Sequence, residues 1–389
     1  MNGLTIRNKS EVLGKLEGSQ LLLSCMIAFV TILLTSHSIT TAIIKPRLYD
    51  GSINELGRYS MTFDAYEYIE IHSDSAIISI GSSKMREAFD GQLLGQLDDS
   101  DHDFYNLAIA GDRPYVRMLE VSAILELKPE MIILEIGPTT FSSLATPVPE
   151  SVHSRMAHLI SLGSVDLDRF PNSVLNSTDK EMLPNSRSEQ LNLLASYVPI
   201  AIEDTIEIEF FSEEQPYPCS GSLANVRCVP LPNNSTYDEY LKYPTQFRNS
   251  LEAIKAGKSS RWTIEEFYGP ALDVYINGSY HNPEGVYNKN QMAFEYMIKQ
   301  FTGAGIEVVL VGLPYNPVLL NRLSIGQWDY YNTSIEIYTN MPDVVVYDMM
   351  WDNDWEDFHF NDYTHMSREG EVLFATKLIQ QLSPLLEVE

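Results

Sequence analysis

The sequence has few basic residues and few cysteines for its length. Its 389 residues include 26 Lys and Arg against 53 Asp and Glu, which gives a formal net charge of -27. A chain this acidic repels the phosphate backbone of nucleic acids, so a general nucleic-acid-binding function is excluded. Three cysteines are too few for a fold built on disulfides. The fold must therefore rest on apolar burial, for which a hydrophobic content of 44% is ample.

Motifs that hold cofactors and metals are also missing. Nothing matches the phosphate-binding pattern G-x-x-x-x-G-K-[ST], and no G-x-G-x-x-G stands between a strand and a helix. No group of Cys, His and carboxylate residues has zinc-site spacing. The acidic residues 352–357 lack the glycine and the distal glutamate of a calcium loop. The sequence therefore predicts neither a bound cofactor nor a metal.

One long apolar segment is present, close to the N-terminus. Residues 21–34 (LLLSCMIAFVTILL) are almost wholly apolar, and the apolar pattern resumes at Ile43 and Ile44. Counted over residues 21–44, the segment exceeds the roughly 20 residues that span a bilayer. The basic residues that precede it are Arg7, Lys9 and Lys15. By the positive-inside rule we expect a signal anchor with residues 1–20 in the cytoplasm and the remainder outside. Cleavage of this segment as a signal peptide, which would release a secreted protein, is the alternative.

Two of the cysteines agree with an extracytoplasmic location. Cys219 and Cys228 are nine positions apart in a stretch rich in Pro, Ser and Gly. Outside the cytosol such a pair is expected to form a disulfide.

Beyond residue 75, short apolar runs alternate with helical patterns. The expected strands are residues 76–80, 104–109, 131–136, 308–313 and 344–347. The expected helices are residues 84–97, 114–127, 287–301 and a last one that begins at Ser367 as its N-cap. This alternation predicts an α/β fold, a flavodoxin-like three-layer sandwich with a five-strand parallel sheet.

A long insertion interrupts this pattern after the third strand. It leaves at the carboxyl end of the sheet, where open α/β sheets bind ligands. We interpret it as a lid or substrate-facing subdomain; the alternative is an insertion that only shields the sheet. The expected organisation is a linker (45–74), a first core part (75–141), the insertion (142–280) and a second core part (281–389).

A candidate nucleophile follows the first expected strand. Gly81-Ser82-Ser83 lies between that strand and a helix, where backbone N–H groups and the helix dipole favour developing negative charge. Taken alone, the same three residues are more typical of an ordinary strand-to-helix turn with a serine N-cap.

A candidate base lies near the C-terminus. In Asp362-Tyr363-Thr364-His365 the carboxylate can orient the imidazole, whose other nitrogen is then available to take a proton from a serine. Asp99 and His102 have the same spacing without matching context. Position favours the C-terminal pair, because the loops after the first and last strands of a parallel sheet open on the same edge.

Three ordered motifs resemble those of the SGNH (GDSL-like) hydrolase superfamily. They are Gly81-Ser82-Ser83, Asn106-Leu107-Ala108-Ile109-Ala110-Gly111 and Asp362-x-x-His365-Met366-Ser367-x-x-Gly370. The resemblance implies Ser83 as nucleophile, His365 as general base and Asp362 as its orienting carboxylate. It also implies an oxyanion hole that includes the N–H groups of Ser83 and Gly111.

Two positions depart from the family pattern. The Asp that usually precedes the nucleophile is Ser82, a variant associated with membrane-anchored relatives that modify polysaccharides. A further family motif, expected after the third strand, should read Gly-x-Asn, whereas this chain has Gly137-Pro138-Thr139. Thr139 would then donate to the oxyanion in place of the Asn, and loss of one such donor costs about 10²- to 10³-fold in rate.

The resemblance, together with the anchor, implies acyl transfer on an extracytoplasmic glycan. Ser83 would form an acyl-enzyme that water resolves in an esterase and a sugar hydroxyl resolves in an O-acyltransferase. The substrate would be an acylated glycan or another ester, and a membrane acyltransferase is a candidate partner. The alternative is a catalytically inactive envelope protein that binds glycan or docks to such an acyltransferase.

Overall fold

The computed structural model describes residues 18–39, 54–98, 102–109, 111–138, 150–162, 165–184, 237–242, 288–322 and 325–386, with a few single positions between 140 and 195. The chain divides into two compact units, Met1–Arg47 and Leu48–Glu389.

In the first unit, helix α1 (Gly18–Ile39) falls where the sequence predicts a membrane anchor. Apolar side chains on it, Leu22 and Phe29 among them, are exposed. Nevertheless, among the residues that the structure describes, no helix has both the length and the apolar character required to cross a membrane. Residues 40–44, the end of the expected anchor, lie outside the described residues. The anchor therefore stays a prediction.

The second unit is organised around one five-stranded sheet. Its strands are all parallel and follow the order β2-β1-β3-β4-β5. The strands are β1 (Ala76–Ile80), β2 (Asp103–Asn106), β3 (Met131–Ile136), β4 (Glu307–Gly312) and β5 (Val344–Asp348). This order is consistent with a flavodoxin-like fold. The predicted five-strand parallel sheet is confirmed.

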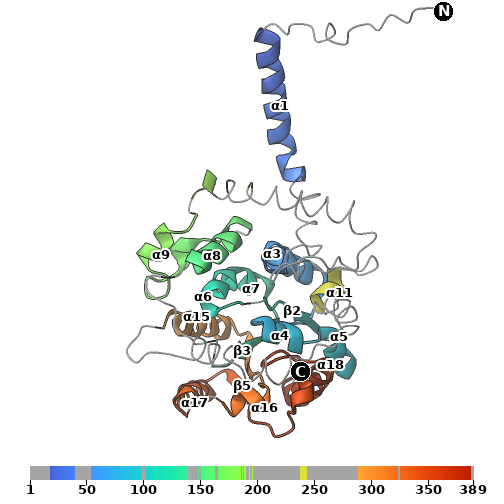
Figure 1. Cartoon of the computed structure of the whole chain (residues 1–389). Helices are drawn as coiled ribbons and strands as arrows, with labels where there is room; N and C mark the ends of the chain where they lie inside the picture. The colour runs from blue at the N-terminus through green and yellow to red at the C-terminus, as the bar shows by residue number, and fades with distance from the viewer. Residues whose placement is uncertain are drawn as a thin grey trace, which may run out of the picture. The chain divides into compact units, whose positions relative to one another are not determined.

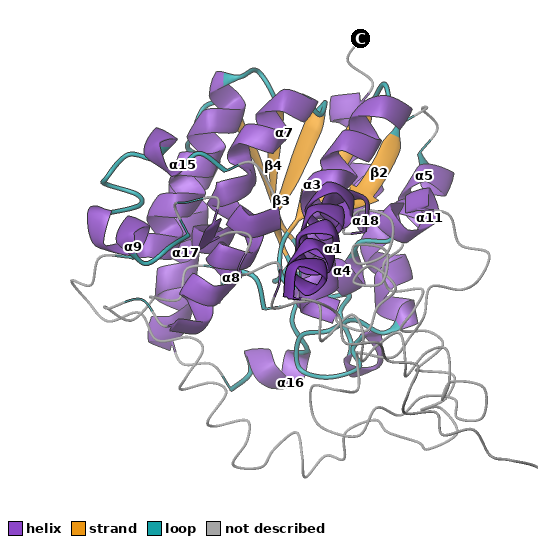
Figure 2. Ribbon diagram, turned by 90° about the horizontal axis from the view of Figure 1, so that it is seen from above, coloured by secondary structure: helices purple, strands orange, loops and turns teal. Residues whose placement is uncertain are grey.

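Helices cover both faces of this sheet (Figures 1 and 2). On one face, Ile78 of β1 belongs to a core with residues of α3, α7, α8 and α15; on the other, Ile77 belongs to a core with α4, α5 and α18. Neighbouring strand residues enter different cores because their side chains alternate. The helices are α3 (Asn54–His72), α4 (Ser83–Ala88), α5 (Gly91–Leu97), α6 (Pro114–Arg117), η3 (Met118–Glu120), α7 (Val121–Leu127), α8 (Glu150–Leu162), η4 (Leu167–Arg169), α9 (Ser177–Glu181), α11 (Tyr237–Lys242), α15 (Lys289–Gly303), α16 (Pro317–Leu320), α17 (Ile325–Thr339), η7 (Asp357–His359) and α18 (Arg368–Leu386).

The helix expected over residues 84–97 is two helices. Helix α4 ends where the Phe89 N–H donates to the Met85 carbonyl (2.9 Å). Helix α5 begins after Asp90, whose side chain accepts a hydrogen bond from the Leu93 N–H (2.9 Å). Asp90, in the middle of this segment, is an N-cap residue after which a new helix begins. The apolar periodicity of residues 84–97 runs through it and so predicts a single helix.

Two segments contribute more to the core than the sequence indicated. The stretch expected as linker contains α3, whose Ala65, Tyr66 and Ile69 are buried. The described parts of the insertion likewise place Met156 and Leu241 in the core cluster that includes α3. Helix α11 packs on β2, whereas α3 and α8 pack on each other and on neighbouring helices. The lid function expected for the insertion stays a prediction.

Candidate active site

The candidate nucleophile is the first residue of α4. Ser82 is the N-cap and accepts a hydrogen bond from the Lys84 N–H (3.3 Å), so Ser83 begins the helix at the carboxyl end of β1. Gly81 permits this tight turn, because a Cβ there would stand 2.6 Å from the Met85 Cβ and 2.7 Å from a Glu135 oxygen. The turn thereby presents Ser83 at the edge where parallel sheets place ligands.

The candidate acid–base pair lies in a loop that is closed on itself. Phe360 and Met366 form an antiparallel bridge, and the Asn361 N–H donates to the His365 carbonyl (2.8 Å). Within the loop, Oδ1 of Asp362 accepts hydrogen bonds from the N–H groups of Thr364 (2.9 Å) and His365 (2.8 Å). These bonds fix the carboxylate relative to the imidazole before any substrate arrives.

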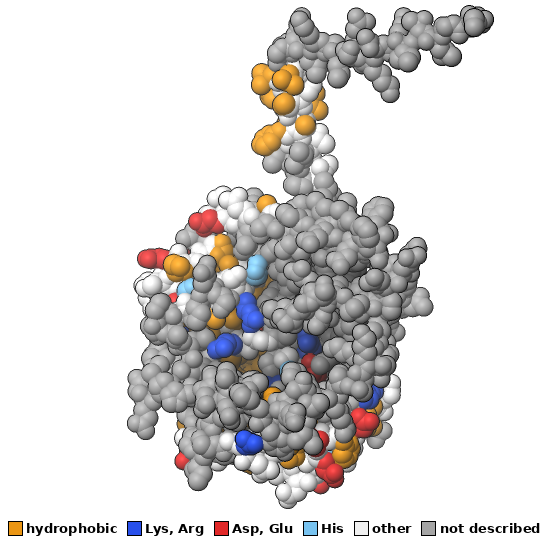
Figure 3. Space-filling view, in the orientation of Figure 1, with side chains coloured by type: hydrophobic (Ala, Val, Ile, Leu, Met, Phe, Trp, Pro, Cys, Tyr) orange, Lys and Arg blue, Asp and Glu red, His pale blue; other side chains and the backbone are white. Residues whose placement is uncertain are grey.

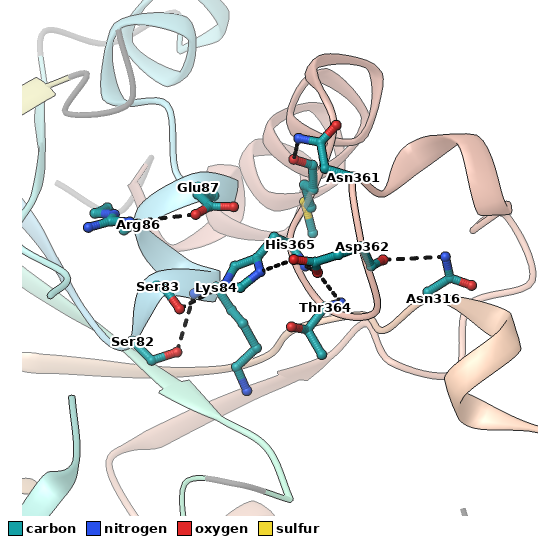
Figure 4. Close-up of polar contacts among 11 residues, drawn as sticks. Ser82, Ser83, Lys84, Arg86, Glu87, Asn316, Asn361, Asp362, Thr364 and His365 are labelled. Atoms are coloured by element: carbon teal, nitrogen blue, oxygen red, sulfur yellow. Dashed lines mark hydrogen bonds and ion pairs between the residues drawn. The ribbon is translucent and has the colours of Figure 1, made fainter. Parts of the chain in front are cut away.

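The three predicted residues meet in one hydrogen-bonded chain (Figure 4). The His365 Nε2 lies 2.8 Å from the Ser83 Oγ, and the His365 Nδ1 lies 2.6 Å from the Asp362 Oδ2. The side chains of His365 and Asp362 are 24% and 25% exposed, so neither is sealed inside the core. With Nδ1–H donating to the carboxylate, Nε2 is the nitrogen that can accept the serine proton.

The charge state of Asp362 suits an orienting role. Burial disfavours its ionised form, but the neighbouring charge of His365 and hydrogen bonds from the His365 ring and two backbone N–H groups outweigh that cost. Together they lower the pKa of Asp362 from 3.8 to about 2. Asp362 is therefore a carboxylate at neutral pH.

The second motif lies beside the nucleophile turn. The Ile109 N–H donates to the Gly81 carbonyl (3.0 Å), and the Asn106 side chain donates to the carbonyls of Arg86 (3.0 Å) and Phe89 (2.6 Å). Two residues beyond Ile109, Gly111 has a φ of +66°, a conformation that favours glycine. Thr139, the third expected oxyanion donor, lies outside the described residues.

Positive charge gathers beside Gly111. The Arg155 guanidinium donates to the Gly111 carbonyl. Burial and the nearby charge of Arg155 lower the pKa of Arg113, two residues further along the chain. Lys and Arg side chains appear near the middle of the face drawn in Figure 3, whereas most of its Asp and Glu side chains lie toward the edge. The two guanidinium groups thus place positive charge close to Gly111.

Other candidate groups lie elsewhere or serve structural roles. His359 accepts a hydrogen bond from the Glu356 N–H through its Nδ1 (3.0 Å), as part of a capping box around η7. His102 contacts Asp98 (2.9 Å) next to the amino end of β2, whereas Ser83 lies at the carboxyl ends of the strands. In the described ranges, no group of three or more His, Cys, Asp or Glu could hold a metal ion. Cys219 and Cys228, the expected disulfide, lie outside the described residues.

A buried ion pair beneath the nucleophile was not predicted from the sequence. Lys84, the residue after Ser83, lies 2.9 Å from the Glu135 carboxylate of β3. A single carboxylate within the apolar strand MIILEI was the available signal, because a buried charge needs a partner.

Comparison of the sequence with protein-family models gives no match, and a search of curated proteins finds no relative either.

Proposed function

We propose that the protein is an SGNH-like serine O-acyl esterase or O-acyltransferase that works through an acyl-enzyme at Ser83. The observation that supports this most strongly is the contact chain from Ser83 through His365 to Asp362, at 2.8 and 2.6 Å. These distances lie within the range for proton transfer between a nucleophile and its base.

Each residue has a defined step in the proposed reaction. The Ser83 Oγ attacks the ester carbonyl carbon while the His365 Nε2 takes its proton. The imidazolium that forms is stabilised by the Asp362 carboxylate. The tetrahedral intermediate then breaks the bond to the leaving alcohol, which receives the proton from His365. Water or a sugar hydroxyl, activated by the same nitrogen, attacks the acyl-enzyme and regenerates Ser83.

The glycan substrate and the location are part of the proposal. They depend on the resemblance to SGNH hydrolases and on the basic and apolar N-terminal segment. We propose a single-pass protein with its catalytic part outside the cytoplasm, where it would act on an acylated surface glycan. In the transferase version, a membrane acyltransferase partner supplies the acyl group.

Hydrolysis of p-nitrophenyl acetate by the full-length protein tests the reaction class. We expect turnover that is lost in Ser83→Ala and His365→Gln. The matched control is His102→Gln, since His102 also contacts an Asp but lies at the other edge of the sheet. Wild-type-like turnover in Ser83→Ala would contradict the proposal.

A second assay separates the esterase from the transferase and from an inactive binding protein. The wild type is incubated with an acetylated oligosaccharide, with and without an unacetylated acceptor. Free acetate indicates the esterase, and acetyl groups on the acceptor indicate the transferase. Binding of the oligosaccharide without either product, in a protein that also fails to hydrolyse the reporter ester, would favour the noncatalytic alternative.

A further inference from the structure

A buried ammonium–carboxylate pair lies directly beneath the nucleophile turn. The Lys84 Nζ is 2.9 Å from the Glu135 Oε1, and the two side chains are only 7% and 5% exposed. The Glu135 carboxylate also accepts hydrogen bonds from Ser82, through the backbone N–H (2.6 Å) and the Oγ (3.0 Å). Glu135 therefore holds Ser82, the residue immediately before the nucleophile, through both its backbone and its side chain.

The negative charge of Glu135 is maintained by its surroundings. Burial alone would favour the neutral acid, but the Lys84 charge and the hydrogen bonds from Lys84 and Ser82 lower the pKa of Glu135. Lys84 also donates to the Tyr315 OH (2.8 Å) and lies 4.8 Å from the centre of the Tyr315 ring. A buried pair is costly to desolvate and contributes little to stability on its own. Because the pair lies beside the site, its position is better explained by a role in holding the nucleophile turn in place than by a contribution to stability.

Lys84 connects three strand ends that border the site. Its backbone follows β1, its carboxylate partner lies on β3, and Tyr315 follows β4. A Cβ on Gly137, at the end of β3, would lie 3.6 Å from the Lys84 Nζ and 3.3 Å from the Tyr315 OH. A shift of the ammonium would thus disturb the nucleophile turn and the chain at Gly137 together.

The connection continues to the acid–base loop. Asn316, next to Tyr315, donates its backbone N–H to the Tyr363 carbonyl (3.0 Å). Its side chain donates to the Asp357 carboxylate (2.9 Å) and approaches the Asp362 carbonyl (3.4 Å; Figure 4). Ser83 and His365 are 282 positions apart in sequence, and this buried path joins their two loops.

We propose that Lys84 and Glu135 are positioning residues, which hold the Ser83 turn in register with the His365 loop through Tyr315 and Asn316. The inference rests on the proposed function. It assigns to a carboxylate from β3 the task of fixing the nucleophile turn, whose usual Asp is here Ser82. An error of about 1 Å in such a constellation can cost on the order of 10²-fold in rate.

The same protein contains a matched control of similar chemistry. Lys289 contacts Asp179, with side chains 8% and 6% exposed, and lies 5.3 Å from the centre of the Tyr115 ring. The Tyr115 OH donates to the carboxylate of this pair, Asp179 (2.8 Å), whereas the Tyr315 OH accepts from the ammonium of the first pair, Lys84 (2.8 Å). This second pair joins α6, α9 and α15 and has no described contact with Ser83, His365 or Asp362.

The test compares Lys84→Met with Lys289→Met in the full-length protein. Both variants remove a buried ammonium, so both should lower the melting temperature. Only Lys84→Met should lower kcat for p-nitrophenyl acetate, by about 10- to 100-fold, with KM changed less than about 2-fold. Tyr315→Phe, which removes one hydroxyl, should lower kcat by a few fold, whereas Tyr115→Phe should not. A Lys84→Met protein that is folded and retains kcat within 2-fold, or an equal loss of kcat in Lys289→Met, would overturn the inference.

Nitrogen-15 NMR of the His365 ring tests, independently of turnover, whether Lys84 holds Ser83 in contact with His365. The Nε2 signal is assigned with His365→Gln, and its response to loss of the serine contact is calibrated with Ser83→Ala. We expect Lys84→Met to shift the signal as Ser83→Ala does and Lys289→Met to leave it unchanged. An unchanged signal in Lys84→Met refutes the positioning role, whereas a wild type without Ser83-dependent turnover refutes only the proposed reaction.

Discussion

Replacement of Asp362 by Asn isolates the role of the carboxylate. Oδ1 of Asp362 accepts two backbone N–H bonds, which an Asn oxygen can keep, so the loop should hold its shape. The Asn NH₂ group would then face the His365 Nδ1, where Oδ2 now lies at 2.6 Å. A donor at that position forces Nδ1 to accept and Nε2 to carry the proton. In this tautomer His365 cannot take a proton from Ser83.

The expected magnitudes differ for rate and for stability. In Ser-His-Asp proteases the equivalent change lowers kcat about 10⁴-fold, and we expect a loss of at least 10³-fold here. The pKa of Asp362 is lowered from 3.8 to about 2. At 1.36 kcal/mol per pH unit, this corresponds to about 2 kcal/mol of folding free energy. Because the pKa is depressed, that contribution is present above pH 4 and is lost as the pH falls toward 2.

Two measurements check this prediction, with Asp98→Asn as the control because Asp98 contacts His102 away from the site. Steady-state hydrolysis of p-nitrophenyl acetate at pH 7 should show the loss of kcat only in Asp362→Asn. The difference in melting temperature between wild type and Asp362→Asn should shrink below pH 4. A kcat within 10-fold of wild type, or an equal loss in Asp98→Asn, would refute the assigned role.

Three further changes have expected outcomes. Gly111→Ala places a Cβ at a φ of +66° and 2.9 Å from the Arg155 guanidinium, so fluorophosphonate labelling of Ser83 should slow; unchanged labelling would count against a role for Gly111 near the oxyanion. Gly370→Ala places a Cβ too close to the His359 carbonyl, so urea unfolding should show a free energy of unfolding lower by about 1–3 kcal/mol. A urea midpoint equal to that of wild type would argue against this close packing. Burial raises the pKa of Asp112 from 3.8 to about 8, against the opposing charge of Arg117 and with support from that of Glu120. The contribution of Asp112 to stability should therefore fall as the pH rises from 4 to 8, so the melting temperature of Asp112→Asn should rise relative to that of wild type over that window; parallel curves would contradict this.

The sheet was largely predictable because parallel strands buried on both faces are continuous apolar runs. The bounds of β1 and β3 are those expected, while β2 ends at Asn106, three residues earlier than expected. The chain after Asn106 still runs beside β1, with Leu107 and Ile109 donating to Ser79 and Gly81, but it leaves the regular strand to form the second motif.

Local signals could not reveal contacts between distant segments. The spacing of Asp362 and His365 and a serine at a strand–helix turn are each weak signals. Their expected position at the same end of the sheet, together with the resemblance of the motifs to those of SGNH hydrolases, brought the three candidate residues into one hypothesis. The contact of Lys84 with Glu135 spans 51 positions and has no spacing rule, so only the carboxylate within an apolar strand hinted at it. Helix α3 was missed although its buried residues Ala65, Tyr66 and Ile69 have helical spacing, because few strongly apolar residues mark the buried face of this mostly polar stretch.

The most direct test of the central claim is to locate the site of a covalent adduct. The full-length protein is treated with a fluorophosphonate, digested and analysed by peptide mass spectrometry. We predict one phosphonylated peptide, modified at Ser83, and at least 10²-fold slower modification in His365→Gln. Modification at another residue, or a rate at Ser83 that does not depend on His365, would contradict it.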